Sequence, residues 1–390
     1  MTMETKNNIF DEYLAEYLKV DKKKKGKILD HIRFVTKMHR KAVIRKFRTL
    51  QLQDPCKEEK RGRETFYTPD VTAALYDVWE ASSEICGELL YAVVREYVDI
   101  LIRDKMWKHG DGATEKLLFM SEGTMKRRVS SFMKMRRFRK GMSATKPSEL
   151  KVIVPIFTGP WKDEPPGSGQ IDTVVHCGSS LLGDMAYSLN YTDAAVYWIV
   201  LRAQWNKGQE ATKESMECVK KKLPFPWLSA HPDTGNEFIN HCVIPWCQEQ
   251  KIRMTRSRPG HKNDNMYVEE RNGHVVRKFV GYVRLDCKEA VGALNELYEI
   301  LAMYLNHFVP VKKCLEKIRI GSKYKRVYEK KAKTPYQRVL EHEKISTEVK
   351  EKLKVEHQKL NPLVLHREIE KLTANVYNMQ KRHGKSNNQS

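Results

Sequence analysis

The sequence predicts an α/β protein in which an all-helical region precedes a mixed five-stranded sheet with flanking helices. Three observations support this prediction. From about Ile28 to Lys140, apolar residues recur at helical spacing. After a stretch rich in Pro and Gly, residues 142–169, three runs of β-type composition follow one another: "GQIDTVVHCG", "MAYSLNYTD" and "YWIVLRAQW". Strand-like and helical segments then alternate, which adds strands to the sheet and helices to its faces.

The order of the elements predicts the topology. Short turns join the first three strands, which is typical of an antiparallel meander. The next segments are expected to be a helix over 211–222, a buried strand in "FPWLSAHPD", a helix through "NEFINHCVIPWCQEQ", a short strand "IRMT" and a helix beginning near Asn263. We expect a helical region at 1–147, an α/β core at 148–308 and a basic, partly helical segment at 309–390.

The charge balance points to a polyanionic partner. The chain has 71 Lys and Arg against 49 Asp and Glu, a formal net charge of +22 over 390 residues. Such a field attracts nucleic acid over long range, although a basic soluble enzyme is the alternative. The eight cysteines show no paired CxxC pattern, which fits a reducing compartment. No apolar run approaches the ~18 residues of a membrane span, so we expect a cytoplasmic protein with no membrane partner.

Three acidic residues occupy positions that packing alone does not explain. Asp172 lies inside the first strand, where Asp is disfavoured. Asp233 ends the fourth strand, where open α/β sheets bind ligands, and Glu269 lies in the first turns of a helix. Singly, they can be read as a satisfied strand residue, a helix cap and a solvated Glu. Together they would repel unless Mg²⁺ or Mn²⁺ neutralised them, which implies two-metal phosphodiester chemistry.

The motifs around these acids resemble those of the DDE transposases and retroviral-type integrases, whose catalytic core is RNase H-like. Between Asp233 and Glu269 lie 35 residues, the family's characteristic spacing, and between Asp172 and Asp233 lie 60, also within its range. The surrounding segments look like a bacterial insertion-sequence transposase over roughly residues 117–340: "PGSGQIDTVVHCG", "DTGNEFIN", "TRSRPGHKNDNMYVEERN", "VGYVRLD", "LNELYEILAMYLNHF" and "KAKTPYQRVL".

The resemblance decides between competing acids. Asp172 alone has a strand context followed by a β-branched run, unlike its rivals Asp163, Asp184 and Asp193. Asp264 competes with Glu269 but stands at the helix entry, where it caps better than it coordinates. Glu237 follows Asp233 by four residues and is expected on a helix turn near the site, more as a solvated residue at the core edge than in a supporting role.

The resemblance also implies an activity. Asp172, Asp233 and Glu269 would bind two Mg²⁺ (or Mn²⁺) ions, cleave DNA at transposon ends and transfer the freed 3′-hydroxyl into target DNA. A homo-oligomer is expected, since two DNA ends must be held at once. A metal-dependent nuclease of the same fold that lacks strand transfer, and a non-catalytic DNA-binding regulator descended from a transposase, are the alternatives.

Two groups of residues are expected to bind double-stranded DNA. The stretch "TEKLLFMSEGTMKRRVSSFMKMRRFRK", about residues 114–140, predicts a helix-turn-helix that reads the element's inverted repeats. Its second helix is expected to contact base edges through Thr124, Lys126, Arg127 and Arg128; a charged, solvated helix is the alternative.

The second group surrounds Glu269, where basic and amide side chains could hold the DNA backbone and terminal bases. These residues are Arg258, Lys262, Asn265, Asn272 and Arg277. An ordinary solvated helix is the competing interpretation. No zinc is predicted, because His31, His39, Cys56 and Cys86 have no compact finger spacing. Because we expect the protein to bind DNA, we also expect it to associate with the nucleoid.

Overall fold

The computed structural model describes residues 3–52, 66–133, 150, 153–159, 161–258, 262–320 and 323–384. They form two compact units, Met1–Phe66 and Tyr67–Ser390, each described here by itself. The boundary between the units falls at neither 147 nor 308. The division into three segments at 147 and 308 therefore stays a prediction about function. The two compact units are divided after Phe66 instead.

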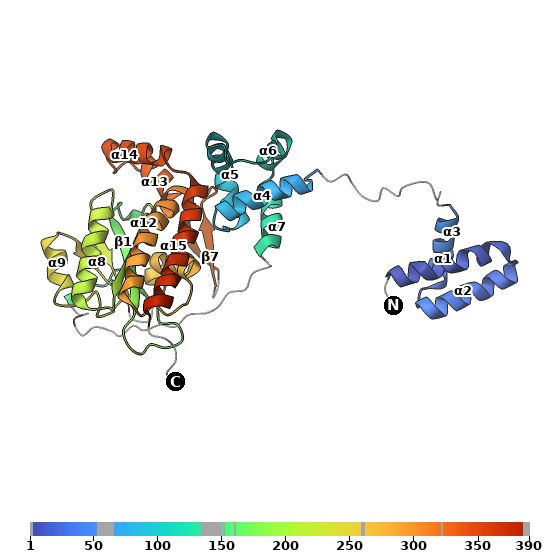
Figure 1. Ribbon diagram of the computed structural model, residues 1–390, viewed down its shortest axis with the longest axis horizontal. Coiled ribbons are helices and arrows are strands. Elements are labelled where there is room, and N and C mark those ends of the chain that lie inside the picture. The colour runs from blue at the N-terminus through green and yellow to red at the C-terminus, as the bar shows by residue number, and fades with distance from the viewer. Residues whose placement is uncertain are drawn as a thin grey trace. The chain divides into compact units, whose positions relative to one another are not determined.

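The N-terminal unit is a small three-helix unit (Figure 1). Its helices are α1 (Met3–Lys19), α2 (Lys22–Thr36) and α3 (Arg40–Gln51). The backbone N–H of Lys24 donates to the Asp21 carboxylate and caps α2. Phe10, Ile32 and Phe47 form the centre of its core, which explains the helical spacing of apolar residues in this part of the sequence.

Four helices open the second unit: α4 (Pro69–Ala81), α5 (Gly87–Arg103), α6 (Asp111–Leu118) and α7 (Glu122–Met133). The single long helical stretch of the sequence is broken between α4 and α5, where Ser83 and Glu84 have positive φ angles of 54° and 60°. Helices α5 and α7 cross closely at Gly87, whose missing Cβ would lie 2.7 Å from the Lys126 Cα.

The central sheet has the strand order β3-β2-β1-β4-β5. Its strands are β1 (Ser168–Val175), β2 (Ala186–Asp193), β3 (Ile199–Trp205), β4 (Ser229–His231) and β5 (Arg253–Met254). β1 to β3 form an antiparallel meander, and β4 and β5 are added parallel to β1. The predicted α/β class and mixed five-stranded sheet are confirmed, and the order and directions are those of an RNase H-like fold.

Helices cover both faces of the sheet. Helix α12 (Lys288–Phe308) packs on the face that carries Val174 and Leu201, whereas α8 (Gln209–Lys222) and α9 (Val243–Glu249) pack on the face that carries Ile171 and Leu189. The other elements are η2 (Trp161–Asp163), η3 (Lys262–Asn265), α10 (Met266–Arg271), η4 (Asn272–Arg277), α11 (Lys278–Val280), β6 (Cys314–Ile320), β7 (Lys323–Tyr328), α13 (Pro335–Glu341), α14 (Thr347–Gln358) and α15 (Pro362–His383).

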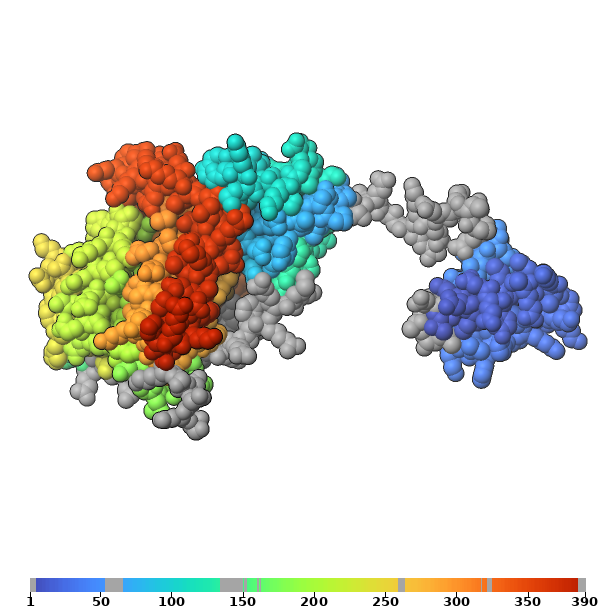
Figure 2. All heavy atoms as spheres, viewed as in Figure 1, coloured from blue at the N-terminus to red at the C-terminus, as the bar shows by residue number. Residues whose placement is uncertain are grey.

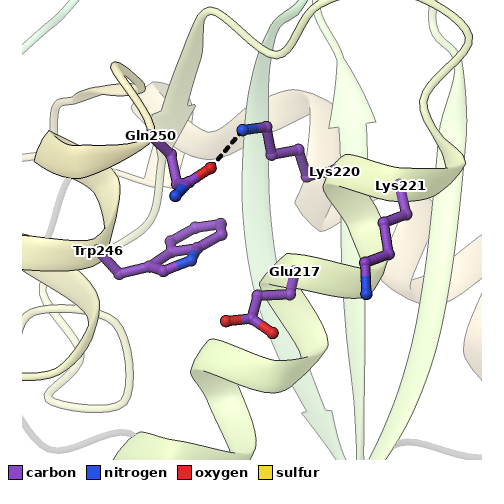
Figure 3. A pocket seen from close by; sticks show the side chains of 5 residues that line it. All are labelled: Glu217, Lys220, Lys221, Trp246 and Gln250. Carbon is purple, nitrogen blue, oxygen red and sulfur yellow. Dashed lines mark hydrogen bonds between the residues drawn. The ribbon is translucent and has the colours of Figure 1, made fainter.

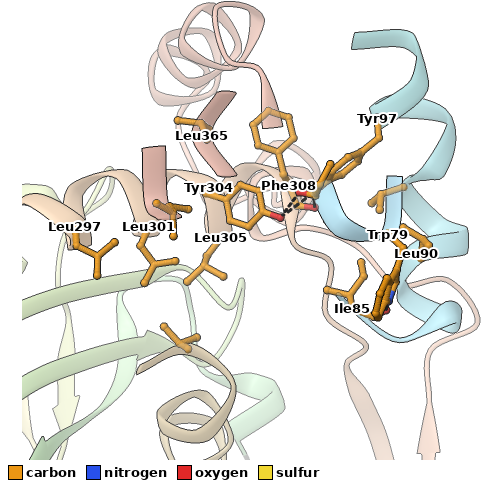
Figure 4. Close-up of a cluster of buried hydrophobic side chains, with 14 of the residues drawn as sticks. Trp79, Ile85, Leu90, Tyr97, Leu297, Leu301, Tyr304, Leu305, Phe308 and Leu365 are labelled. Carbon is orange, nitrogen blue, oxygen red and sulfur yellow. Dashed lines mark hydrogen bonds between the residues drawn. The ribbon is translucent and has the colours of Figure 1, made fainter. Parts of the chain in front are cut away.

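One hydrophobic core joins the helical region to the sheet. Tyr97 of α5 and Tyr304 of α12 meet there with their hydroxyl oxygens 3.4 Å apart, among leucines of α12 and α15 (Figure 4). The Tyr304 hydroxyl also donates to the Ala81 carbonyl at 2.8 Å. In Figure 2 the red side chains of α15 lie along the orange ones of α12 and beside the blue helix α4. Helices α4 to α7 and the C-terminal α15 are therefore packed as one body with the sheet.

No helix in the described ranges is both long enough and apolar enough to cross a lipid bilayer.

Candidate active site

The parallel pairing of β1 with β4 brings Asp172 and Asp233 to the same end of the sheet. In that pairing Gln170 of β1 lies opposite His231 of β4. Asp172 follows Gln170 by two residues, and Asp233 follows His231 by two residues. Burial, and then the charge of Asp233, raise the pKa of Asp172 to about 8. Burial also raises the pKa of Asp233, although the Gly235 backbone N–H, which donates to it at 2.7 Å, lowers it. The two carboxylates are thus close enough to repel.

Strand β1 also fixes the start of α10. The Gln170 side chain is fully buried; its Oε1 accepts from the backbone N–H of Tyr267 (2.8 Å) and Val268 (3.2 Å), and its Nε2 donates to the Asp264 carbonyl (2.7 Å). These bonds satisfy the first N–H groups of the helix from outside it. A strand glutamine that caps a distant helix gives no recognisable sequence signal, so sequence reasoning missed it.

Asn272, at the end of α10, completes the link to β1. Its Nδ2 donates to Asp172 Oδ2 at 2.6 Å, and its Oδ1 accepts from Asn190 Nδ2 at 3.0 Å. Gln170 and Asp172 are two residues apart on one strand and therefore face the same side of the sheet. The amide of Asn272 is thus bonded to Asp172, and its predicted contact with DNA stays a prediction.

The third predicted carboxylate lies differently. Glu269 follows Val268 on α10, and its side chain is exposed. It is not among the main causes that raise the pKa of Asp172 or Asp233. Across the described ranges, no three His, Cys, Asp or Glu side chains converge closely enough to hold a metal ion as they stand. The structure therefore brings Asp172 and Asp233 together and holds Glu269 on the exposed side of α10.

Glu237 takes a place that the sequence did not favour for it. The expected helix over this segment begins only at Val243, and Glu237 lies in the preceding turns with just 3% of its surface exposed. Its Oε1 accepts from Thr173 Oγ1 at 3.3 Å, whereas its Oε2 is buried and accepts no hydrogen bond in the described structure. Burial, and then Asp233, raise its pKa. The prediction of a solvated residue was wrong, because the chain folds Glu237 back under the sheet edge.

Asp172, Asp233 and Glu237 carry the oxygen donors that a hard divalent cation takes, although in the described structure the three side chains do not converge on one point. All three are carboxylates with raised pKa values, and Glu237 Oε2 has an unsatisfied acceptor site. Mg²⁺ and Mn²⁺ prefer oxygen ligands of this kind. A cation bound among them would relieve both their mutual repulsion and the cost of their burial.

Other residues predicted around Glu269 are mostly bonded within the protein. Arg258 forms a bidentate ion pair with Asp264, with N–O distances of 2.9 and 3.0 Å. Arg277 donates to the Val175 carbonyl of β1 at 2.7 Å, and Asn265 is buried with no partner for its Oδ1 among the described residues. The side chain of Lys262 lies outside the described part of the chain.

The Arg277 contact depends on the turn between α10 and α11. η4 is a π-helical turn, whose hydrogen bonds span five residues instead of the four of an α-helix and which redirects the side chains that follow Asn272. Arg277 therefore does not lie where a straight helix from Glu269 would place it.

Helix α7 shows which of its predicted DNA contacts face solvent. Lys126 and Arg127 are exposed, and Lys126 pairs with Glu122 at 3.2 Å. Arg127 bonds within the helix, to the Gly123 carbonyl and to Thr124 Oγ1. Arg128 instead donates to Thr72 Oγ1 (2.7 Å) and to the Tyr67 carbonyl (3.2 Å). The part of the predicted second helix from 134 to 140 lies outside the described residues.

A shallow pocket elsewhere is separate from the carboxylates. Helices α8 and α9 line it with Glu217, Lys220, Lys221, Trp246 and Gln250 (Figure 3). Neither β1 nor α10 contributes a lining residue, so this pocket does not belong to the candidate active site.

Comparison with known proteins identifies a relative that is similar to most of the chain. No family model matches the chain. The chain is 32% identical over 329 residues to the uncharacterized protein y4rM of Sinorhizobium fredii (strain NBRC 101917 / NGR234), covering 84% of this chain and 93% of that protein. The fold and the carboxylate pair define an RNase H-like α/β protein. This chain belongs to the family of y4rM.

Two solved structures overlap the chain loosely. A chain of the simian T-cell lymphotropic virus intasome, in complex with PP2A regulatory subunit B56 gamma, is 14% identical with a TM-score of 0.30; the match covers 50% of this chain and 64% of that one. The catalytic core domain of BIV integrase is 13% identical with a TM-score of 0.28, over 50% of this chain and 97% of that one. At these TM-scores the overlaps carry no further conclusion.

Proposed function

We propose that this protein is a DNA transposase that cleaves the ends of a mobile element and joins the 3′-hydroxyl to target DNA. The observation that carries the proposal is that Asp172 on β1 and Asp233, two residues after the parallel strand β4, lie at the same end of an RNase H-like sheet and repel each other. Paired carboxylates buried beside the central strands of a sheet suit a divalent cation better than they suit packing. The 35-residue spacing to Glu269 supports the same conclusion.

Glu269 is the third catalytic carboxylate in this proposal. Asn272 lies three residues after it, close to the same face of the helix, and already bonds to Asp172. Gln170 and Asn272 hold the two ends of α10 beside β1, which keeps the helix that carries Glu269 next to the pair.

Each group has a distinct task in the proposed reaction. Asp172, Asp233 and Glu269 would hold two Mg²⁺ or Mn²⁺ ions, whose chemistry when bound would be to activate a water or a 3′-hydroxyl and to stabilise the leaving oxygen. Asn272 orients the Asp172 carboxylate through its amide. The exposed Lys126 and Arg127 of α7 contact double-stranded DNA, and the basic charge of +22 draws DNA to the protein. A homo-oligomer holds the two ends.

The test uses DNA from the borders of the gene. Pre-cut duplexes carrying those borders are incubated with the protein, Mg²⁺ and supercoiled plasmid. We expect plasmid molecules joined to the duplex ends. Cutting without any joined product would favour a nuclease of the same fold and overturn the transposase proposal.

One observation favours a second candidate, a DNA-binding regulator derived from a transposase. Glu269 is exposed on α10, and among the described residues no three His, Cys, Asp or Glu side chains converge on a metal site. A regulator would bind the same border DNA without altering it in Mg²⁺ or Mn²⁺. Binding of that DNA with no cleavage under either metal would support this candidate over the transposase.

A further inference from the structure

We propose that Glu237 is a further metal ligand, which shares a cation with Asp233. This inference rests on the proposed function, because it adds a fourth carboxylate to the site formed by Asp172, Asp233 and Glu269. It assigns a metal-binding role to a residue that the sequence placed near the site but favoured as a solvated residue.

The first support is an unsatisfied atom. Glu237 is 3% exposed, yet its Oε2 accepts no hydrogen bond in the described structure. A buried carboxylate oxygen without a partner costs free energy, so native proteins nearly always pair such atoms with a donor or a cation. No described side chain supplies a donor to Oε2, and its Oε1 is held by Thr173. Only Oε1 is paired, so Oε2 is the atom of Glu237 that is available to a cation.

The second support is where Oε2 points. A Cβ built on Gly235 would lie 2.6 Å from Glu237 Oε2 and 2.8 Å from Asp233 Oδ1. The two oxygens are therefore separated by no more than the sum of these distances. Oxygens on opposite sides of an octahedral Mg²⁺ are about 4.2 Å apart, from bonds of about 2.1 Å. A single cation between Glu237 and Asp233 is compatible with that geometry after small side-chain movements.

The third support is the absence of a side chain at Gly235. Any other residue would place an atom between the two carboxylates, at a distance that real Cβ atoms do not adopt. The Gly235 backbone N–H meanwhile donates to Asp233 Oδ1 at 2.7 Å and fixes that carboxylate. The turn from 233 to 237 thus holds two carboxylates facing one space, with a glycine between them.

Binding of Mn²⁺ to the DNA-free protein tests the proposal without any catalytic readout. Electron paramagnetic resonance counts free Mn²⁺ for the wild type and for three variants: Glu237→Gln, Asp233→Asn and, as a matched control, Glu270→Gln on the exposed face of α10. We expect Glu237→Gln and Asp233→Asn each to weaken Mn²⁺ binding by at least ~10-fold, and Glu270→Gln to bind as the wild type does.

Thermal melting separates a ligand from a structural residue. If Glu237 binds the cation, Glu237→Gln melts no lower than the wild type without metal, since an unpaired buried charge has been removed, and it loses the rise in Tm that Mn²⁺ gives the wild type. A lower Tm without metal, together with an unchanged rise in Mn²⁺, would show a purely structural role and overturn the proposal.

The two proposals fail in different ways. If Asp233→Asn loses Mn²⁺ binding while Glu237→Gln retains it, Glu237 is not a ligand and the proposed function stands. If Asp233→Asn binds Mn²⁺ as the wild type does, the metal site itself is misplaced and both proposals fall.

Discussion

The Asn272 amide donates to the Asp172 carboxylate across 2.6 Å and thereby ties the end of α10 to the central strand. The bond is made to the charged form of Asp172 and lowers its pKa, against the larger effect of burial. One residue thus connects the two parts of the candidate site, the carboxylate pair on the sheet and the helix that carries Glu269.

Replacing Asn272 with Ala should destabilise the protein more at high pH than at low pH. A hydrogen bond to a charged group contributes about 1.5–3 kcal/mol, and Asp172 is charged only above about pH 8. We expect the loss in the free energy of unfolding to be larger at pH 9 than at pH 5, measured by urea denaturation. Gly273→Ala, which places its Cβ in open space, is the control. An equal loss at both pH values would mean that the bond to Asp172 does not matter for stability.

The raised pKa of Asp172 predicts how stability depends on pH without metal. An unfolded Asp loses its proton near pH 3.8, whereas Asp172 in the folded protein keeps it up to about pH 8. Between these values the folded state binds more protons, so the free energy of unfolding falls as pH rises. Melting in EDTA from pH 5 to 9 should show this fall, and Asp172→Asn should flatten it. A slope unchanged in Asp172→Asn would contradict the burial of this carboxylate.

Gly235→Ala should separate metal binding from folding. The new Cβ would meet the Glu237 and Asp233 carboxylates at 2.6 and 2.8 Å, so both carboxylates must turn away from the positions that Thr173 and the Gly235 N–H give them. We expect a change in stability of about 1 kcal/mol or less with a loss of Mn²⁺ binding. Gly292→Ala, inside α12 with no atom near its Cβ, should leave Mn²⁺ binding unchanged and raise stability by about 0.5–1 kcal/mol, as Gly→Ala does in a helix interior. Retained Mn²⁺ binding in Gly235→Ala would argue against a shared cation at this turn.

Gln170→Leu should release the start of α10. The substitution removes three hydrogen bonds and leaves the N–H groups of Tyr267 and Val268 unpaired, at a cost of about 2–4 kcal/mol. Hydrogen exchange should accelerate over residues 264–272 more than over α12. Gln248→Leu, on the exposed side of α9, provides the comparison. Unchanged exchange over α10 would show that its position does not depend on β1.

On α7, Arg127 and Arg128 should behave differently. Arg127→Ala removes an exposed charge and should weaken DNA binding, reducing the slope of log affinity against log salt by about 1, with Tm unchanged. Arg128→Ala breaks the bonds to Thr72 and Tyr67 and should lower the free energy of unfolding by about 1–2 kcal/mol. If Arg128→Ala instead weakened DNA binding at constant Tm, its predicted contact with base edges would be supported.

The fold was largely predictable because its signals are local. β-Rich runs such as "GQIDTVVHCG" and the break near Pro165 fixed the meander, and the position of Asp172 and Asp233 followed from strand order. The contacts within the candidate site were less predictable. The cap made by Gln170 and the burial of Glu237 arise from contacts between residues 64 to 98 positions apart in sequence. No periodicity or spacing records such contacts.

Helix geometry limited the prediction near Glu269. A straight α-helix was assumed from Asn263, whereas the structure has the 3₁₀ turn η3, the short α10 and the π turn η4. Such changes of pitch depend on tertiary contacts, here the bonds from Gln170 and Asp172 to the segment. The spacing of 35 residues identified Glu269, but only the fold could show that its side chain is exposed.

The central claim is that Asp172 and Asp233 form a metal-dependent centre that cuts DNA. Its most direct test is the rate at which wild type, Asp233→Asn and Glu270→Gln cleave border DNA of the gene in Mg²⁺. We predict that Asp233→Asn lowers the cleavage rate by at least ~10³-fold. Glu270→Gln should cleave within about threefold of the wild-type rate, because it removes an exposed charge on another side of the helix from Glu269. Cleavage by Asp233→Asn at the wild-type rate would contradict the account.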